Sequence, residues 1–222
     1  MNEAHGQSPY PETNMKNLTI VDHPIIRRDV TFLRDAKTPN DQFRHILARI
    51  AGMMAFQVTK DFELRKFSVR TPLERTTGYA LRMPIVIVPV LRAGLGMVEG
   101  FLNVLPEARV GHVGLYRNEK TLQPVDYYSK FPSQLSRSLV ILIDPMLATG
   151  GSATAAITFL KKKGASNVRI ACLVAAPAGV KMVTHHHPDV HIFCASLDRT
   201  LNKKGYILPG LGDAGDRIFG TE

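Results

Sequence analysis

Two loops of the sequence combine residue types that suit phosphate groups. In the first, Asp144 opens a segment of small and hydroxyl residues that runs to Ser152 and then enters a helical pattern ending at Lys163. An acidic side chain at a strand tip can accept hydrogen bonds from ribose hydroxyls, while backbone N–H groups, hydroxyls and a helix N-terminus make a socket for phosphate. Glycines and hydroxyls alone are about equally compatible with an ordinary strand-to-helix turn.

The second loop, residues 90–96, places Arg92 beside Ala93 and Gly94 at the start of another helical pattern. A guanidinium group is planar and permanently charged, so it can clamp a pyrophosphate group through paired hydrogen bonds. One arginine beside a glycine is weak evidence by itself.

The elements that must position these loops alternate between apolar runs and helical patterns. Apolar spacing predicts a long amphipathic helix from about residue 38 to Val58. Apolar runs then predict strands, with helical patterns between them: strands at 85–90, 109–115, 139–143, 168–175 and 190–195, and helices at 94–105, 152–163 and 179–187. This alternation predicts an α/β fold with a central five-stranded parallel sheet and helices on both faces. In such a sheet, ligands bind beyond the carboxyl ends of the strands, where both loops begin.

The length of 222 residues fits one such domain with appended segments. We expect an N-terminal arm at residues 1–38, a core at 39–200 and a C-terminal tail at 201–222 that belongs to the same domain. Residues 210–215 of the tail formally match a dinucleotide-binding fingerprint, but only seven residues follow Gly215. That motif needs a following helix and an acid about twenty residues further on, so we reject it. Four histidines, His185 to His187 and His191, could suggest a metal site, but they lack a supporting acidic or cysteine cluster, and a surface turn before Pro188 is expected instead.

The composition limits the partners and the location. A net charge of +9 suggests an anionic partner, but the basic residues are scattered, so a phosphorylated small molecule is favoured over nucleic acid. No apolar run approaches the roughly 20 residues of a membrane helix, and the N-terminus has neither a basic start nor an apolar stretch, so we expect a cytoplasmic protein without membrane contact. Cys172 and Cys194 lie in apolar runs and are expected to be reduced and buried.

Four strings together resemble the uracil phosphoribosyltransferases, a branch of the type I phosphoribosyltransferases: residues 91–97 (LRAGLGM), 116–119 (YRNE), 144–152 (DPMLATGGS) and 205–216 (GYILPGLGDAGD). They occur in the order that the family shows and cover the chain from about residue 85 to its end. Most type I relatives carry two adjacent acids at the strand tip, whereas the second position here is Pro145, as in the uracil-specific branch. Residues 1–84 match much less clearly.

The resemblance implies a reaction of uracil with 5-phosphoribosyl 1-pyrophosphate that forms uridine monophosphate and pyrophosphate. It places this donor on Arg92, Arg117, Asp144, Pro145, Met146, Leu147, Ala148, Thr149, Gly150, Gly151, Ser152 and Asp213, with Arg92 and Asp213 as catalytic residues. It places uracil against Met146, Ala148, Tyr206, Ile207, Gly212, Asp213 and Ala214. A non-proline cis peptide is expected at or beside Leu91-Arg92.

The same resemblance implies a magnesium ion held mainly by the substrate pyrophosphate and water, a homo-oligomer, and in some members activation by guanosine triphosphate. Two rival functions remain at this point. One is a related transferase for a purine base or orotate, against which the string 212–216 (GDAGD) argues. The other is an RNA-binding regulator on the same fold, for which the sequence has neither a basic stripe nor an aromatic RNA-binding signature.

Overall fold

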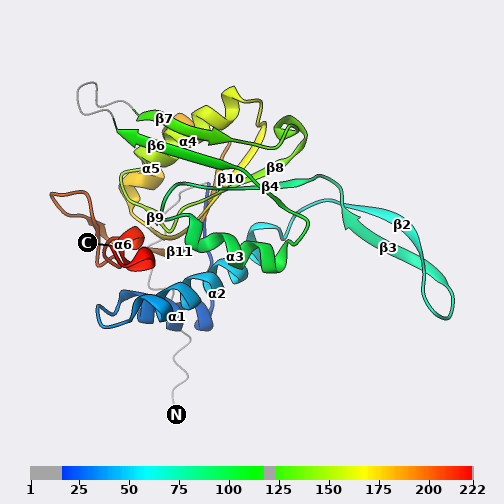
Figure 1. The fold of residues 1–222 in the computed structure, drawn as a ribbon, viewed down its shortest axis with the longest axis horizontal. Helices are drawn as coiled ribbons and strands as arrows, with labels where there is room; N and C mark the ends of the chain where they lie inside the picture. Colours follow the sequence, from blue (N-terminus) through cyan, green and yellow to red (C-terminus); the bar gives the residue numbers. More distant parts are fainter. Residues whose placement is uncertain (1–16, 118–123, 222) are drawn as a thin grey trace, which may run out of the picture.

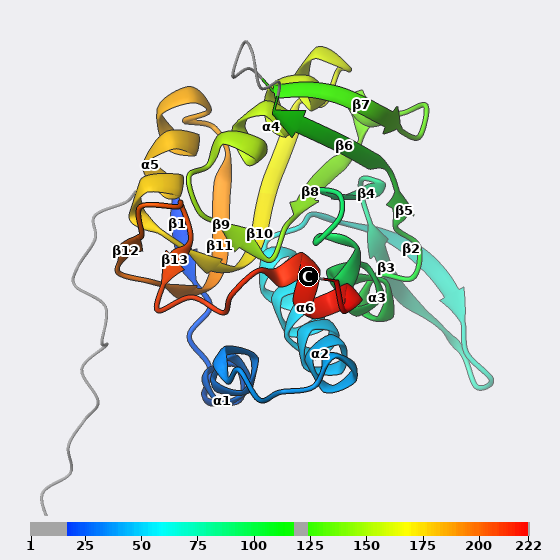
Figure 2. The same cartoon turned by 60° about the vertical axis from the view of Figure 1, so that its left-hand side comes forward.

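A parallel sheet forms the centre of the computed structural model, which describes residues 17–117 and 124–221. Its middle consists of β4 (Ile85–Pro89), β8 (Leu139–Ile143), β10 (Asn167–Ala175) and β11 (His191–Leu197). These strands are almost wholly buried, as continuous apolar runs covered on both faces require. The strand order is β1-β11-β10-β8-β4-β5, and every pairing is parallel (Figures 1 and 2).

The sheet has seven strands, so the predicted count of five is wrong. Two short strands were not predicted: β1 (Leu18–Ile20), which pairs with β11, and β9 (Met146–Leu147), which pairs with β10. The run predicted as one strand at 109–115 divides at Gly111 into β5 (Arg109–Val110), which stays in the sheet, and β6 (His112–Arg117). β6 leaves to pair with β7 (Pro124–Lys130) in an antiparallel hairpin. Strands of two or three residues are too short to show a periodic pattern.

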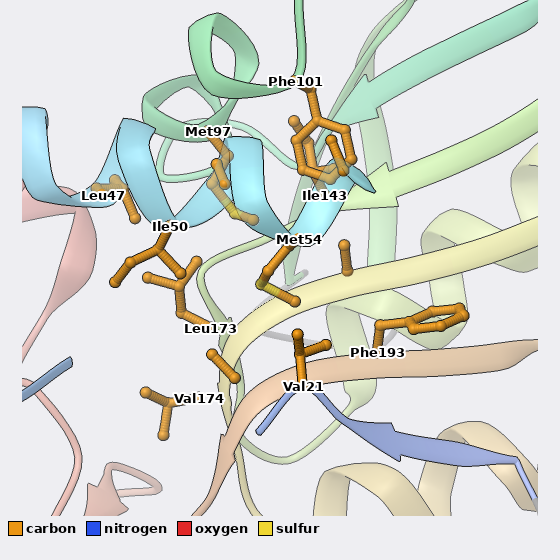
Figure 3. Close-up of a cluster of buried hydrophobic side chains, with 14 of the residues drawn as sticks. Val21, Leu47, Ile50, Met54, Met97, Phe101, Ile143, Leu173, Val174 and Phe193 are labelled. Atoms are coloured by element: carbon orange, nitrogen blue, oxygen red, sulfur yellow. The ribbon is translucent and has the colours of Figure 1, made fainter. Parts of the chain in front are cut away.

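Helices cover both faces of the sheet, as predicted. One core cluster joins the sheet to α1 (Pro24–Arg34), α2 (Asn40–Val58), α3 (Leu95–Val104) and α6 (Ala214–Phe219). The other joins it to α4 (Gly151–Lys162) and α5 (Pro177–His186). Figure 3 shows Ile50 and Met54 of α2 and Met97 of α3 meeting Leu173 of β10. No helix of residues 17–117 and 124–221 is both long enough and apolar enough to span a membrane.

A two-stranded arm stands away from this body (Figure 1). It consists of β2 (Leu64–Arg70) and β3 (Arg75–Leu81), and every side chain of β2 is exposed. The Thr71 hydroxyl closes its tip by accepting hydrogen bonds from the N–H groups of Leu73 (3.2 Å) and Glu74 (3.0 Å). No element was predicted for this segment.

The tail folds back over the body instead of standing apart from the core. It forms the hairpin of β12 (Thr200–Leu201) and β13 (Ile207–Leu208) and then α6. The side chains of Ile207, Leu211, Ala214 and Ile218 are all buried in the cluster that contains α2. The tail therefore contributes four apolar side chains to the core, although its sequence is rich in glycine.

Candidate active site

The two loops singled out in the sequence lie side by side because they follow paired strands. Pro89 of β4 is in register with Ile143 of β8. The arginine loop (residues 90–96) is anchored to the end of β8 by a hydrogen bond from the Val90 N–H to the Ile143 carbonyl at 3.0 Å. A Cβ atom at Gly94 would lie 2.5 Å from that carbonyl oxygen, so this contact requires glycine. The peptide between Leu91 and Arg92 is cis, as expected.

Asp144 lies at the tip of β8, at the start of the phosphate loop (residues 144–152). The residue as a whole is partly exposed, but its carboxyl group is surrounded by protein. This desolvation raises the pKa of Asp144 to about 7, against a smaller opposing effect of the hydrogen bond from the Met146 N–H at 3.3 Å. A carboxyl group that gains hydrogen bonds from bound hydroxyls would ionise more readily, so Asp144 is suited to hold a ribose.

The middle of the phosphate loop is fixed to the sheet. The Pro145 carbonyl accepts hydrogen bonds from the N–H groups of Leu173 (3.1 Å) and Val174 (3.0 Å). The Leu147 carbonyl accepts one from Ala176 at 2.9 Å, and the Leu147 side chain is buried. Pro145 and Leu147 therefore support the loop through their backbone.

The end of the loop presents backbone and hydroxyl groups at the start of α4. Gly150 has φ +83°, a left-handed conformation, and no side chain of the described residues caps the helix there. Thr149, Gly151 and Ser152 are exposed, and within the described part of the chain the Thr149 hydroxyl makes only a long contact of 3.5 Å with the Gly151 N–H. A helix start with free N–H groups is suited to a phosphate.

Gly179, in the first turn of α5, supports the phosphate loop from behind. A Cβ atom at Gly179 would lie 2.6 Å from the Ala148 carbonyl oxygen and 2.7 Å from that of Leu147, and one at Gly150 would lie 2.7 Å from the Gly179 carbonyl oxygen. The two backbones thus touch where side chains would separate them. Nothing in the sequence distinguished Gly179, because its role depends on a contact between segments about thirty residues apart.

For the substrates that the resemblance implies, we predict that Gly179→Ala raises the KM for 5-phosphoribosyl 1-pyrophosphate by about tenfold, because the new methyl group pushes the phosphate loop from its position. The KM for uracil should change much less. Steady-state kinetics with each substrate varied in turn measures the effect. Ala178→Ser, which changes the exposed neighbour on α5, is the control, and an unchanged donor KM in Gly179→Ala would show that the loop tolerates the displacement.

The tail brings a third group of residues to the two loops. Asp213 caps α6 by accepting a hydrogen bond from the Asp216 N–H at 3.0 Å, and the Asp216 carboxylate lies 3.5 Å from the Arg92 guanidinium. A Cβ atom at Gly215 would lie 3.8 Å from the same guanidinium. At the other end of the tail, a Cβ atom at Gly205 would lie 3.8 Å from the Thr149 methyl group. The tail thus spans the site from the arginine loop to the phosphate loop.

The residues expected at the base present mainly backbone groups. The side chains of Ile207 and Ala214 are buried in the core, so only their N–H and carbonyl groups remain for a ligand. Gly212 is exposed with φ +79°, and Tyr206 is 42% exposed. Met146 and Ala148 are partly buried against the core cluster.

Arg92 is held only lightly. Its side chain is 57% exposed, and besides the long contact to Asp216 it lies over the Phe219 ring at 5.7 Å. An exposed guanidinium with weak partners is available to an incoming anion. The side chain of Arg117 lies outside those that the structure describes, as do residues 118 and 119, so its place at the pyrophosphate stays a prediction.

Comparisons with known proteins identify the family of the chain. A family model described as "Uracil phosphoribosyltransferase" matches residues 20–221. The chain is 55% identical to the uracil phosphoribosyltransferase of Finegoldia magna over 209 residues, which is 94% of this chain and 100% of that protein. It is 53% identical to the protein of the same name from Salinibacter ruber over 207 residues, which is 93% of this chain and 99% of that protein.

Solved structures confirm the fold. The AQ2163 protein from Aquifex aeolicus has a TM-score of 0.85 and 38% identity, covering 91% of this chain and 97% of that one. A hypoxanthine phosphoribosyltransferase from Trypanosoma cruzi, in complex with the product IMP, is only 10% identical with a TM-score of 0.50 over 72% of this chain and 79% of that one, and it shares the fold alone. With the family model and the relatives matching nearly the whole chain, the protein belongs to the uracil phosphoribosyltransferase family.

Proposed function

We propose that this site transfers the 5-phosphoribosyl group of 5-phosphoribosyl 1-pyrophosphate to uracil and forms uridine monophosphate and pyrophosphate. The observation that carries the proposal is the meeting of three segments at the carboxyl ends of β4 and β8: the arginine loop, the phosphate loop and the tail. The arginine loop suits pyrophosphate, the phosphate loop suits the 5'-phosphate and the ribose, and the tail suits the base. The name of the family, uracil phosphoribosyltransferase, describes transfer of a phosphoribosyl group to uracil. Because the core (residues 39–200) and the tail (residues 201–222) both contribute to this site, they act as one domain.

In the reaction, N1 of uracil forms a bond to the anomeric carbon of the ribose while the bond from that carbon to the pyrophosphate oxygen breaks, and the N1 proton leaves to solvent. Positive charge develops on the ribose and negative charge on the leaving group. The phosphate loop holds the 5'-phosphate and Asp144 holds the ribose hydroxyls, which keeps the two reactants in line. Arg92 stabilises the charge of the departing pyrophosphate, with Arg117 as its proposed partner. No covalent enzyme intermediate is needed.

We propose that Mg²⁺ arrives with the donor. Within residues 17–117 and 124–221, no cluster of three or more His, Cys, Asp or Glu side chains is placed to hold a metal ion by itself. The carboxylates of Asp213 and Asp216 beside Arg92 suit an ion bound chiefly through pyrophosphate oxygens and water, with Asp213 facing it. When bound, the ion neutralises part of the pyrophosphate charge.

We predict that uracil and 5-fluorouracil are substrates and that cytosine, orotate and adenine are not. Backbone groups of the tail are fixed in position, and a site that hydrogen-bonds the O4 and N3–H edge of uracil rejects a base with the opposite pattern by several orders of magnitude. The measurement is the turnover of each base with the same donor and Mg²⁺. Pyrophosphate and nucleotide are both assayed and should form in equal amounts. Comparable turnover of cytosine or adenine would overturn the assignment.

We also propose that the protein is a homo-oligomer. The arm exposes Leu64, Phe67 and Tyr79, and Phe56 of α2 is 72% exposed. Exposed large apolar side chains on an arm that also carries basic residues are typical of a protein interface, and a second copy is the partner that we infer. Light scattering should give a mass of at least twice that of the chain, and a monomer at micromolar concentration would contradict it.

Guanosine triphosphate is the effector that we propose on the net charge of +9, and added nucleotide should change the mass or the kinetics.

A further inference from the structure

An arginine and an aspartate that are not among the predicted site residues hold the tail in place. Arg34 at the end of α1 and Asp198 after β11 form a bidentate ion pair, with N–O distances of 2.7 and 2.6 Å. The Asp198 side chain is 3% exposed and that of Arg34 is 23% exposed. Ser196 donates a further hydrogen bond to Asp198 at 3.0 Å.

Both members of this pair bind one residue of the tail. The Gly210 N–H donates to the Asp198 carboxylate at 2.8 Å, and the Gly210 carbonyl accepts from Arg34 at 2.8 Å. Gly210 has φ +60°, and a Cβ atom there would lie 2.1 Å from the Ile207 carbonyl oxygen, so the chain turns sharply at this point. The ion pair therefore fixes a turn that lies between Ile207 and Gly212.

A second arginine braces the next residues of the tail from the same side. Arg217 of α6 donates to the Leu211 carbonyl at 3.1 Å and also binds the carbonyls of Leu33 and Asp35 at the end of α1, the latter at 2.6 Å. It lies over the Phe43 ring of α2 at 4.4 Å. The end of α1 is thus tied to residues 210 and 211 by two independent sets of hydrogen bonds.

The surroundings of Asp198 favour the ionised form of its carboxyl group. Burial by itself would raise the pKa of Asp198, but the hydrogen bonds and charge of Arg34, with the Gly210 N–H and Ser196, hold that pKa below its usual value. A buried carboxylate that lost this partner would be left uncompensated. The planar fork of arginine, unlike lysine, can bind both carboxylate oxygens and the Gly210 carbonyl together.

We propose that Arg34 and Asp198 are positioning residues for the base subsite: they set the Gly210 turn and, through it, the backbone groups of Ile207 and Gly212 that read the edge of uracil. This inference rests on the proposed function. Neither residue touches the base. A purely structural pair, by contrast, would tie α1 to the sheet without affecting the choice of base. Through this ion pair, α1 helps to determine which base the site accepts.

The test uses Arg34→Lys and the double variant Arg34→Gln with Asp198→Asn, in the full chain. Arg34→Lys keeps the charge but loses the fork, and the double variant removes both charges so that no buried charge is left unpaired. Arg27→Gln is the matched control, because Arg27 lies on the same helix and pairs with Asp22 at the surface. KM for uracil and for the donor, kcat, and turnover of cytosine and thymine relative to uracil are measured, with thermal unfolding to confirm folding at the assay temperature.

We expect the KM for uracil to rise by about tenfold or more in both variants, because small displacements of a positioned group have large effects. The KM for the donor should stay within about twofold, discrimination against other bases should weaken, and Arg27→Gln should match the wild type. Equal changes in both KM values, or an unchanged uracil KM in folded Arg34→Lys, would overturn the inference. If the double variant does not fold, Arg34→Lys decides the question. Wild-type protein that fails to use uracil would contradict the proposed function instead, so the two failures are distinguishable.

Discussion

Replacing Arg92 with lysine lowers kcat by more than about tenfold and leaves the melting temperature unchanged: this is the result that we expect. The guanidinium fork can bind two oxygens of the leaving pyrophosphate, whereas an ammonium group offers a single point of charge. Loss of one positioned donor to a developing negative charge typically lowers kcat by a factor of about 100 to 1,000, and the retained charge of lysine reduces the loss. Replacement by alanine should therefore have the larger effect.

The structure explains why the fold should tolerate this change. The Arg92 side chain is 57% exposed, and its only close carboxylate among the described residues, Asp216, lies at the limit of hydrogen bonding, 3.5 Å away. Surface pairs of this kind contribute little to stability. Arg109→Lys, at an exposed position on β5, is the control. Full activity of Arg92→Lys would show that pyrophosphate binds elsewhere.

Asp144→Asn should lower kcat/KM for the donor by a factor of about 10 to 100 above pH 7, because hydrogen bonds to a charged group are worth about 1.5–3 kcal/mol. Since the pKa of Asp144 is raised to about 7, the carboxylate that accepts the ribose hydroxyls forms only as pH rises through that value. The wild-type kcat/KM should therefore rise with pH between about 6 and 8. The variant lacks this group, so the ratio of the two profiles isolates it from ionisation of the donor. A ratio independent of pH would contradict the role of Asp144.

The same substitution should stabilise the protein at high pH. The folded state binds the Asp144 proton more tightly than the unfolded state, whose pKa is near 3.8, so wild-type stability falls as pH rises from about 4 to 7. Above pH 7 the full penalty applies, at most ~4 kcal/mol. Urea unfolding of the wild type and of Asp144→Asn should give a difference that is largest at pH 8 and vanishes near pH 4. A constant difference would mean that the carboxyl group is not desolvated.

The sequence predicted the parts of the site that depend on local pattern. Strands β4 and β8 were visible as apolar runs, and in a parallel sheet the loops after such strands meet at one edge, so Arg92 and Asp144 could be placed together. The phosphate loop could be recognised because its glycines and hydroxyls precede a helix directly.

The parts that the sequence did not predict depend on contacts between distant segments. Gly179 matters because its backbone touches Ala148, and Arg34 matters because it meets Asp198 and Gly210. A helix pattern shows which residues are apolar but not which single glycine or arginine lies at a contact. The arm at β2 and β3 has no buried face among the described residues, so its sequence lacks the sustained alternation that marks a half-buried strand.

The most direct test of the account is a crystal structure of the protein with uridine monophosphate. We predict that the 5'-phosphate lies on the N–H groups of Thr149 to Ser152, that the ribose hydroxyls contact Asp144, and that the uracil edge is hydrogen-bonded by the backbone of Ile207, Gly212 and Ala214. The nucleotide should leave Arg92 free for pyrophosphate. A nucleotide bound away from the phosphate loop, or with its base outside the tail, would contradict the central claim that these three segments form one site.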